Sequence, residues 1–269
     1  MALVLARLLE LLENIAPLRY AESWDKVGLL VDPNGNPALG VGRVLCTIDL
    51  TDAVLAEASE RRVDLVVAYH PPLFKPLERL RQSVPEERVI LQAVRAGLAL
   101  YSPHTALDAA AGGVNDWLAS AVGSGRVEPL SRITPDDPHV GLGRRVELAE
   151  PLAVDALVQR IKAHLQLPYV QLAQSERHAS GEPVRSVAVC AGAGGSVLAT
   201  ATADLLLTGE MRHHDVRERV ARGASVVLCG HSNTERGYLP ILARRLEDLA
   251  RGELEVRVAR RDRDPLSTV

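Results

Sequence analysis

The sequence VDLVVAYHPP, residues 63–72, joins an apolar run to a histidine and two prolines. Its first part, 63–68, has the length and the Val and Leu content of a strand that is buried on both faces. Strands of this kind belong to parallel sheets covered by helices. His70 follows directly after the strand, where the functional groups of open α/β sheets gather. These ten residues therefore predict an α/β fold and one candidate functional position.

Strands and helices alternate on both sides of this run. The strands predicted before residue 123 are 41–48 and 98–101, and the helices are 52–62, with Asp52 as its N-cap, 85–96 and 114–122. Residues 123–138 break the pattern with Gly, Ser, Pro and Asp, which is typical of a connecting loop. We therefore expect two lobes, residues 1–124 and 125–269, with the final segment of the second free to pack back on the first.

The second half continues the alternation. Its short apolar runs predict strands at 144–148, 184–189, 204–207, 225–228 and 254–259, and helices separate them, among them 154–165 and 238–250. The predicted fold class is α/β, with two interlinked α/β lobes whose mixed, largely parallel sheets are covered by helices.

Composition and charge exclude several classes of function. The formal net charge is −3, which gives no electrostatic reason to expect nucleic-acid binding, since that normally needs a basic face. Residues 1–16 are apolar, but acidic residues interrupt them and the leucines fall on one helical face, which indicates an amphipathic helix rather than a signal peptide. The scattered Cys46, Cys190 and Cys229 predict buried free thiols. We expect a cytoplasmic protein with neither nucleic acid nor membrane as a partner.

Histidines and carboxylates cluster in or just after the loops that follow four predicted strands. They are His70; His104 and Asp108; Glu210, His213 and His214; and His231 and Glu235. Imidazole combined with carboxylate is the ligand mixture of Zn²⁺, Mn²⁺ and Fe²⁺ sites. The sequence therefore predicts one or two divalent metal ions per chain, held by His70, Asp108, His231 and Glu235.

Each of these residues also has a purely structural explanation. His70 is as well explained by the plain end of a strand, and Asp108 by a helix N-cap. His213 and His214 fit an exposed helix face equally well. The metal hypothesis therefore depends on several loops converging and not on any one spacing.

Four further features are expected to carry no chemistry. His139, His164 and His178 lie in loop or helix-surface contexts, where we expect exposed side chains without a role. The glycine cluster 192–195 lacks the Lys-Ser/Thr of a P-loop. A tight turn from strand to helix is therefore favoured over a phosphate cradle.

Several short segments are specific only in combination. In chain order they are ESWDKVGL (22–29), YHPPLF (69–74), HTALD (104–108) with GGVND (112–116), TGEMRHH (208–214) and GHSNTE (230–235). Together they resemble the Nif-three-like family (NGG-one-interacting factor three), also called GTP cyclohydrolase I type 2 homologues. The chain is similar to the short form, which lacks the domain inserted in longer members.

The resemblance implies two linked α/β lobes, a dinuclear metal site between them and a ring-shaped homohexamer. Carried over by position, His70, Asp108 and Glu235 would hold one metal. His231 would hold the second, with Glu235 bridging the two. Two further residues are implied as candidates for the pocket or for catalysis, Glu210 and His214.

The chain departs from the family pattern at Tyr69, where the resemblance has the first histidine of a pair. A neutral phenol is a poor ligand, because the ordinary pKa of tyrosine is about 10. Three alternatives follow for the second metal: it binds more weakly, it is absent, or His104 supports it. The resemblance implies His104 as a ligand or as a neighbour of the ligands.

The predicted function is metal-dependent hydrolysis of a small nucleotide-like substrate, because a bound metal lowers the pKa of water to about 7. A reaction of the GTP cyclohydrolase type rests on the family label alone. The alternative is a non-catalytic protein that binds, delivers or senses metal, or a ring-shaped regulatory partner, which Tyr69 favours. A third alternative is a structural α/β protein with incidental histidines.

Overall fold

The computed structural model describes residues 2–267, which form two compact units by their backbone contacts. The first unit comprises the chain up to Leu107 together with Tyr238–Pro265, and the second comprises Asp108–Gly237. The segment Tyr238–Pro265 thus groups with the beginning of the chain. The predicted division into lobes at residues 124 and 125 remains a prediction.

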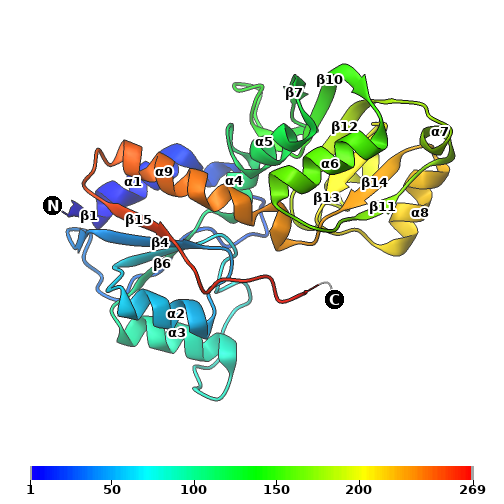
Figure 1. The fold of residues 1–269 in the computed structure, drawn as a ribbon. Coiled ribbons are helices and arrows are strands. Elements are labelled where there is room, and N and C mark those ends of the chain that lie inside the picture. The colour runs from blue at the N-terminus through cyan, green and yellow to red at the C-terminus, as the bar shows by residue number, and fades with distance from the viewer. Residues whose placement is uncertain (1, 268–269) are drawn as a thin grey trace. The chain divides into compact units, whose positions relative to one another are not determined.

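A five-stranded sheet with the order β15-β4-β5-β6-β2 forms the centre of the first unit. Its parallel strands are β15 (Glu255–Val258), β4 (Arg43–Thr47), β5 (Leu65–Ala68) and β6 (Ala99–Ser102), and β2 (Gly28–Val31) runs antiparallel to β6. Helices α1 (Leu5–Ile15) and α9 (Leu239–Leu249) lie on one face of this sheet, and α2 (Asp52–Glu60) and α3 (Pro85–Arg95) lie on the other (Figure 1). Strands β1 (Leu3–Val4) and β3 (Gly40–Val41) form a separate pair.

The local sequence explains these elements. All four residues of β5 are buried, as a strand covered on both faces requires. Helix α1 buries one leucine-rich face, as its amphipathic pattern predicts. The N-cap of α2 is Thr51 and not the predicted Asp52, because the Thr51 hydroxyl accepts a hydrogen bond from the Val54 N–H (3.3 Å).

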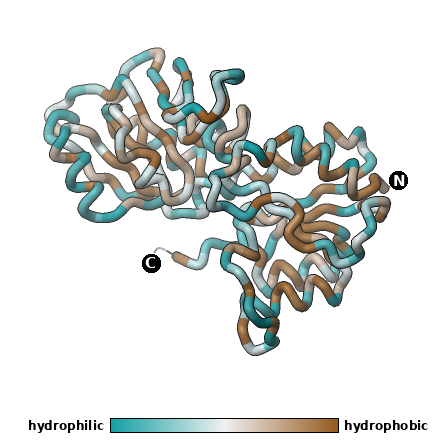
Figure 2. Tube along the Cα trace, turned by 180° about the vertical axis from the view of Figure 1, so that it is seen from behind, coloured by the Kyte–Doolittle hydropathy of each residue, from teal (hydrophilic) through white to brown (hydrophobic). Residues whose placement is uncertain are grey.

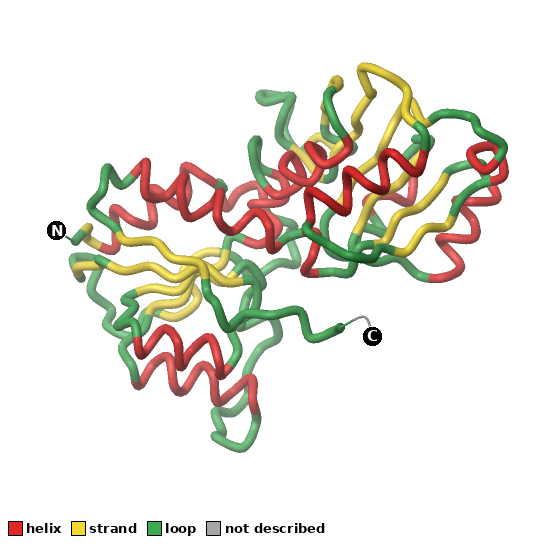
Figure 3. The backbone as a smooth tube through the Cα atoms, viewed as in Figure 1, coloured by secondary structure: helices red, strands yellow, loops and turns green. Residues whose placement is uncertain are grey.

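A six-stranded sheet with the order β11-β14-β13-β12-β10-β7 forms the centre of the second unit. Its strands are β7 (Gly125–Glu128), β10 (Arg144–Leu152), β11 (Gln171–Ala173), β12 (Val184–Cys190), β13 (Leu205–Thr208) and β14 (Ser225–Leu228). Only β12, β13 and β14 pair in parallel. Helix α8 (His213–Ala221) and the 3-10 turn η3 (Val197–Thr200) pack on one face, and α5 (Val114–Ala119) and α6 (Val154–Leu165) lie on the other (Figures 1 and 3).

The remaining elements are short. They are the helices α4 (His104–Ala109) and α7 (Glu176–Ala179), the strands β8 (Ser131–Arg132) and β9 (Gly141–Leu142), and the 3-10 turns η1 (Leu18–Tyr20), η2 (Ser120–Val122), η4 (Ser232–Thr234) and η5 (Arg236–Tyr238). In both units the strands are the most hydrophobic part of the chain (Figure 2).

The predicted α/β class with mixed sheets is confirmed, with three differences in detail. The second sheet is mostly antiparallel, because its outer strands β7, β10 and β11 all pair antiparallel to their neighbours. A 3-10 turn, not a helix, joins β12 to β13. His178 is buried rather than exposed, since its ring hydrogen-bonds to Ser175 and Ser225.

The structure also shows the state of the cysteines and whether any helix is long enough to cross a membrane. All three cysteines are buried free thiols. Within residues 2–267, the structure contains no helix with the length and hydrophobicity needed to span a membrane.

Candidate metal site

Three polar side chains follow the parallel strands of the first unit. Asp49 comes after β4, His70 after β5 and His104 after β6. Because parallel strands end at the same edge of a sheet, the topology gathers these side chains there. The sequence predicted this edge for His70 and His104 but not for Asp49.

The ring of His70 is held by a carboxylate. Its Nδ1 atom lies 2.9 Å from Oδ1 of Asp49, and its backbone N–H donates to the Ile48 carbonyl (3.0 Å). A carboxylate on Nδ1 fixes the ring orientation, and metal-binding histidines usually have this arrangement, with Nε2 as the coordinating atom. His70 therefore has the local structure of a ligand.

His104 is held in a similar way by Asp25. The Asp25 Oδ1 atom lies 2.8 Å from His104 Nδ1, while Oδ2 accepts hydrogen bonds from the Thr105 backbone (3.1 Å) and hydroxyl (2.5 Å). Burial alone would raise the pKa of Asp25, but these hydrogen bonds outweigh it and lower the pKa to about 2. Asp25 is therefore an ionised acceptor at neutral pH, which places the proton on His104 Nδ1.

The parallel strands of the second unit end in a matching set of loops. Gly192 follows β12, Gly209 and Glu210 follow β13, and His231 follows β14. His231 leads into the turn η4, after which Glu235 comes at once. The fold thus brings His231, Glu235 and the glycine loop to one edge of the sheet.

Two carboxylates flank the ring of His231. Its Nδ1 atom lies 2.7 Å from Oε1 of Glu210, and its Nε2 atom lies 3.4 Å from Oε1 of Glu235. The Glu235 side chain is 3% exposed, whereas Glu210 is exposed. Glu210 therefore orients the imidazole, and Nε2 and the Glu235 carboxylate are the atoms placed to coordinate an ion.

Gly192 allows these two side chains to lie where they do. A Cβ atom at this position would lie 2.6 Å from Glu235 Oε1 and 3.0 Å from His231 Nε2, and the backbone has a φ of +62°. The Gly192 N–H donates to the Thr234 hydroxyl (2.8 Å). Residues 192–195 therefore act as a tight turn that admits the two side chains, in agreement with the favoured sequence interpretation.

Asp108 lies in the same unit as His231 and Glu235. Its backbone carbonyl accepts a hydrogen bond from the Asn115 amide (3.1 Å), and the Asn115 carbonyl oxygen accepts one from the Ala191 N–H (2.9 Å). Burial raises the pKa of the Cys190 thiol, and the charges of Asp108 and Glu235 raise it further. Both carboxylates therefore act electrostatically on the same buried thiol.

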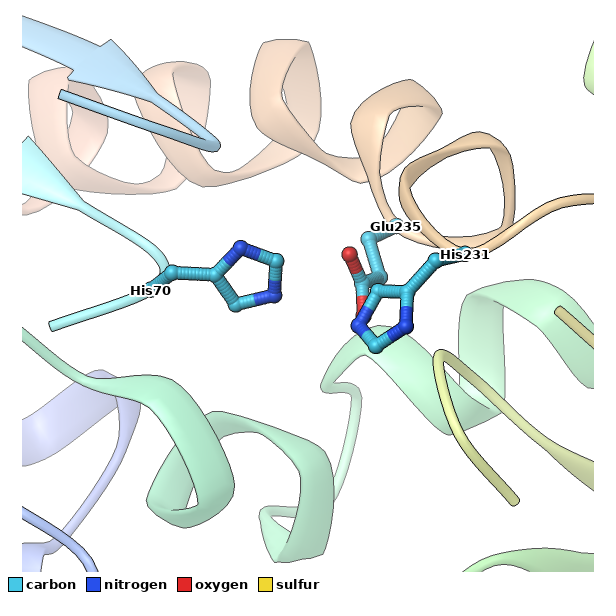
Figure 4. Close-up of side chains that lie close together, drawn as sticks. All are labelled: His70, His231 and Glu235. Atoms are coloured by element: carbon cyan, nitrogen blue, oxygen red, sulfur yellow. The ribbon is translucent and has the colours of Figure 1, made fainter. Parts of the chain in front are cut away.

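His70, His231 and Glu235 each offer one ligand atom, and these atoms lie within 4.8 Å of one another (Figure 4). This group has the composition of a protein metal site, two imidazoles and one carboxylate. The other predicted site residues are not members of it in the described part of the chain: Asp108, Tyr69, His104, Glu210 and His214.

The remaining candidates have different surroundings. Tyr69 is buried, and its ring meets those of His70 and His104 edge to face, with centroids 5.2 and 5.7 Å away. His214 lies in the exposed first turn of α8, beside His213. Glu210 lines a cavity of about 760 Å³ with residues of the glycine loop and of α8.

Sequence reasoning missed the residues that position the candidates. Asp49, Asp25 and Asn115 are 21, 79 and 7 positions from the residues they hold. Asp25 and Asn115 lie within the segments that carried the family resemblance, and this position was the only indication in the sequence that they matter to the site. Asp49 had no such signal beyond its place after a predicted strand.

Comparison with known proteins places the chain in a family. A sequence model of Duf34/NIF3 (NGG1p interacting factor 3) matches residues 4–265. The chain belongs to the NIF3 family. NIF3-like protein 1 of Drosophila melanogaster is 43% identical over 271 residues, which cover 98% of this chain and 89% of that protein. Protein NIF3 homolog of Schizosaccharomyces pombe is 40% identical and is covered over 98% of both chains.

The fold is also that of solved NIF3 structures. The crystal structure of a Bacillus cereus protein related to NIF3 matches with a TM-score of 0.88 over 100% of both chains, at 19% sequence identity. The family resemblance inferred from the short segments is therefore confirmed over the whole chain.

Proposed function

We propose that His70, His231 and Glu235 hold one divalent metal ion, and that the chain uses it to hydrolyse a small nucleotide-like substrate. The observation that carries this proposal is the group of two imidazoles and one carboxylate with ligand atoms within 4.8 Å of one another. The donor set fits Zn²⁺, Mn²⁺ or Fe²⁺. Asp108 is the candidate for a fourth ligand, because the family resemblance implies it and its charge acts on the same buried thiol as that of Glu235.

The protein side chains would prepare this site before any ion binds. Asp49 and Glu210 each hold the Nδ1 atom of one histidine, so that Nε2 is the atom of each ring that would coordinate the ion. A divalent ion held there would act as a Lewis acid and bring the pKa of water to about 7. The cavity of about 760 Å³ that Glu210 lines has the volume of a small-molecule site.

Further features belong to the same proposal. They are a second ion bridged by Glu235, a ring-shaped homohexamer and a reaction of the cyclohydrolase type. Tyr69 weakens the case for the second ion, because a buried phenol replaces the histidine that the family resemblance implies at this position. A phenol is a poorer metal ligand than an imidazole.

Turnover on a panel of nucleotides tests the proposal. We expect hydrolysis that stops after chelation and returns when Zn²⁺, Mn²⁺ or Fe²⁺ is added back. Glu235→Ala should lower kcat/KM by at least 100-fold, because removing a ligand removes the metal chemistry. The matched control is Glu150→Ala, which changes an exposed carboxylate on β10, away from the cavity. Turnover that survives both chelation and Glu235→Ala would contradict the proposal.

The second candidate function is non-catalytic metal binding or metal handling, with or without a protein partner. The specific observation in its favour is Tyr69, because losing a ligand damages a two-metal enzyme more than it damages a binding protein. This alternative predicts tight, exchangeable metal and no hydrolysis of any nucleotide on the panel.

A further inference from the structure

Two of the three Trp and Phe side chains of this chain lie together and exposed. The sequence has one phenylalanine and two tryptophans. Phe74 is 48% exposed and Trp24 is 53% exposed, and their ring centroids are 6.0 Å apart in an edge-to-face arrangement. Exposed large aromatic side chains that cluster commonly mark a binding surface.

The ring of His104 lies beside both aromatic rings. Its centroid is 6.1 Å from that of Trp24 and 6.4 Å from that of Phe74, and both contacts are edge to face. Nδ1 of His104 is hydrogen-bonded to the Asp25 carboxylate, and the Asp25 side chain is not exposed to solvent. The surface therefore offers two aromatic rings and one polar atom, Nε2 of His104.

The backbone at His104 supports a binding role. Its φ is +23°, in the left-handed region that non-glycine residues seldom adopt. Such backbone strain is found mainly where a side chain must be held for function. Asp25 offsets the strain, because it accepts hydrogen bonds from the backbone and hydroxyl of Thr105, the next residue.

We propose that Trp24, Phe74 and His104 form a binding surface for a planar nitrogen heterocycle that carries an N–H donor. The heterocycle would stack on the ring of Trp24, with Phe74 at its edge, and donate its N–H to Nε2 of His104. The inference rests on the proposed function, because it names the substrate class of the same site: the ring of His70 lies 5.5 Å from that of His104.

Three features favour a heterocycle over a second copy of the chain. A planar ring has two faces for stacking, and stacking on aromatic side chains is worth roughly 5- to 150-fold in affinity per base. Ionised Asp25 places the proton on Nδ1, so Nε2 of a neutral imidazole is an acceptor for a ring N–H. If a second copy of the chain covered this surface, Nε2 of His104 would be buried among apolar side chains. Burying an acceptor without a donor costs free energy.

Intrinsic fluorescence and calorimetry with guanosine test the inference, with ribose as the probe that lacks a base. In Trp117→Phe, Trp24 is the only tryptophan, and we expect guanosine but not ribose to quench its emission saturably. In the otherwise natural chain, Trp24→Leu should weaken guanosine binding by roughly 5- to 150-fold. The matched control, Tyr169→Leu, removes another exposed aromatic ring and should leave binding unchanged.

Several outcomes would overturn the inference. One is Trp24 emission that millimolar guanosine does not quench, and another is unchanged guanosine affinity in Trp24→Leu. A third is Trp24 emission that responds to dilution but not to guanosine, which would assign the surface to a second copy. Metal content of the same samples separates the two proposals: normal metal without guanosine binding removes only this inference, and guanosine binding without metal removes only the proposed metal site.

Discussion

Arg144→Met is expected to lower the free energy of unfolding by about 3–5 kcal/mol, the cost of leaving the partner of a buried ion pair uncompensated. Arg144 is 1% exposed. Its Nε and Nη2 atoms donate to the two carboxylate oxygens of Asp116, and its guanidinium also donates to the carbonyls of Gly141 (2.7 Å), Gly143 (2.8 Å) and Ala110 (3.1 Å). Methionine fills similar volume but donates to none of these acceptors, and it leaves the Asp116 carboxylate without its cation.

The expected loss is measured by urea denaturation of the natural chain and the variant. The matched control is Arg126→Met on β7, where the arginine is 71% exposed and its nearest carboxylate is 3.9 Å away. We expect this control to change the unfolding free energy by less than about 0.5 kcal/mol. A loss below about 1 kcal/mol for Arg144→Met would show that the buried guanidinium is dispensable.

Asp25→Asn is expected to have the second largest effect on stability. The pKa of Asp25 in the folded chain is about 2, below its ordinary value of 3.8. A lowered folded pKa adds stability that is fully present above the unfolded pKa and is lost as the pH falls from about 4 to about 2. This contribution is between about 1 and 2 kcal/mol at neutral pH, since its partner His104 is partly exposed and solvent weakens the interaction.

The pH dependence separates this charge effect from a simple loss of packing. We expect the difference in unfolding free energy between the natural chain and Asp25→Asn to shrink steadily as the pH falls from 4 to 2. The matched control is Asp248→Asn, an exposed carboxylate on α9 that should show little difference at any pH. A difference that stays constant down to pH 2 would argue against an ionised Asp25 as the source of stability.

Much of the fold follows from short-range patterns. The run 63–68 predicts β5 because continuous apolar residues suit a strand buried on both faces, and residues 5–15 predict α1 from one apolar face. The short strands β7 and β11 have no comparable pattern, because edge strands are only partly buried. The order of strands in the sheets also lies beyond local pattern, since it is set by contacts between distant segments.

The candidate site was predicted to a similar degree. The rule that functional groups follow the carboxyl ends of parallel strands selected the loops of His70, His231 and Glu235, whose ligand atoms lie within 4.8 Å of one another. It could not select Asp49 or Asp25, because the partner of a histidine is fixed by tertiary structure and not by spacing along the chain. It also did not identify the need for Gly192, which follows from the close approach of Glu235.

The metal content of His70→Ala is the most direct test of the central claim, that distant loops share one ion. The protein is purified without chelators or an affinity tag and analysed for transition metals, beside the natural chain and the exposed control His139→Ala. We predict at least one ion per chain in the natural protein and in His139→Ala, and a clear loss in His70→Ala. Equal metal content in all three proteins, or none in any of them, would contradict the account.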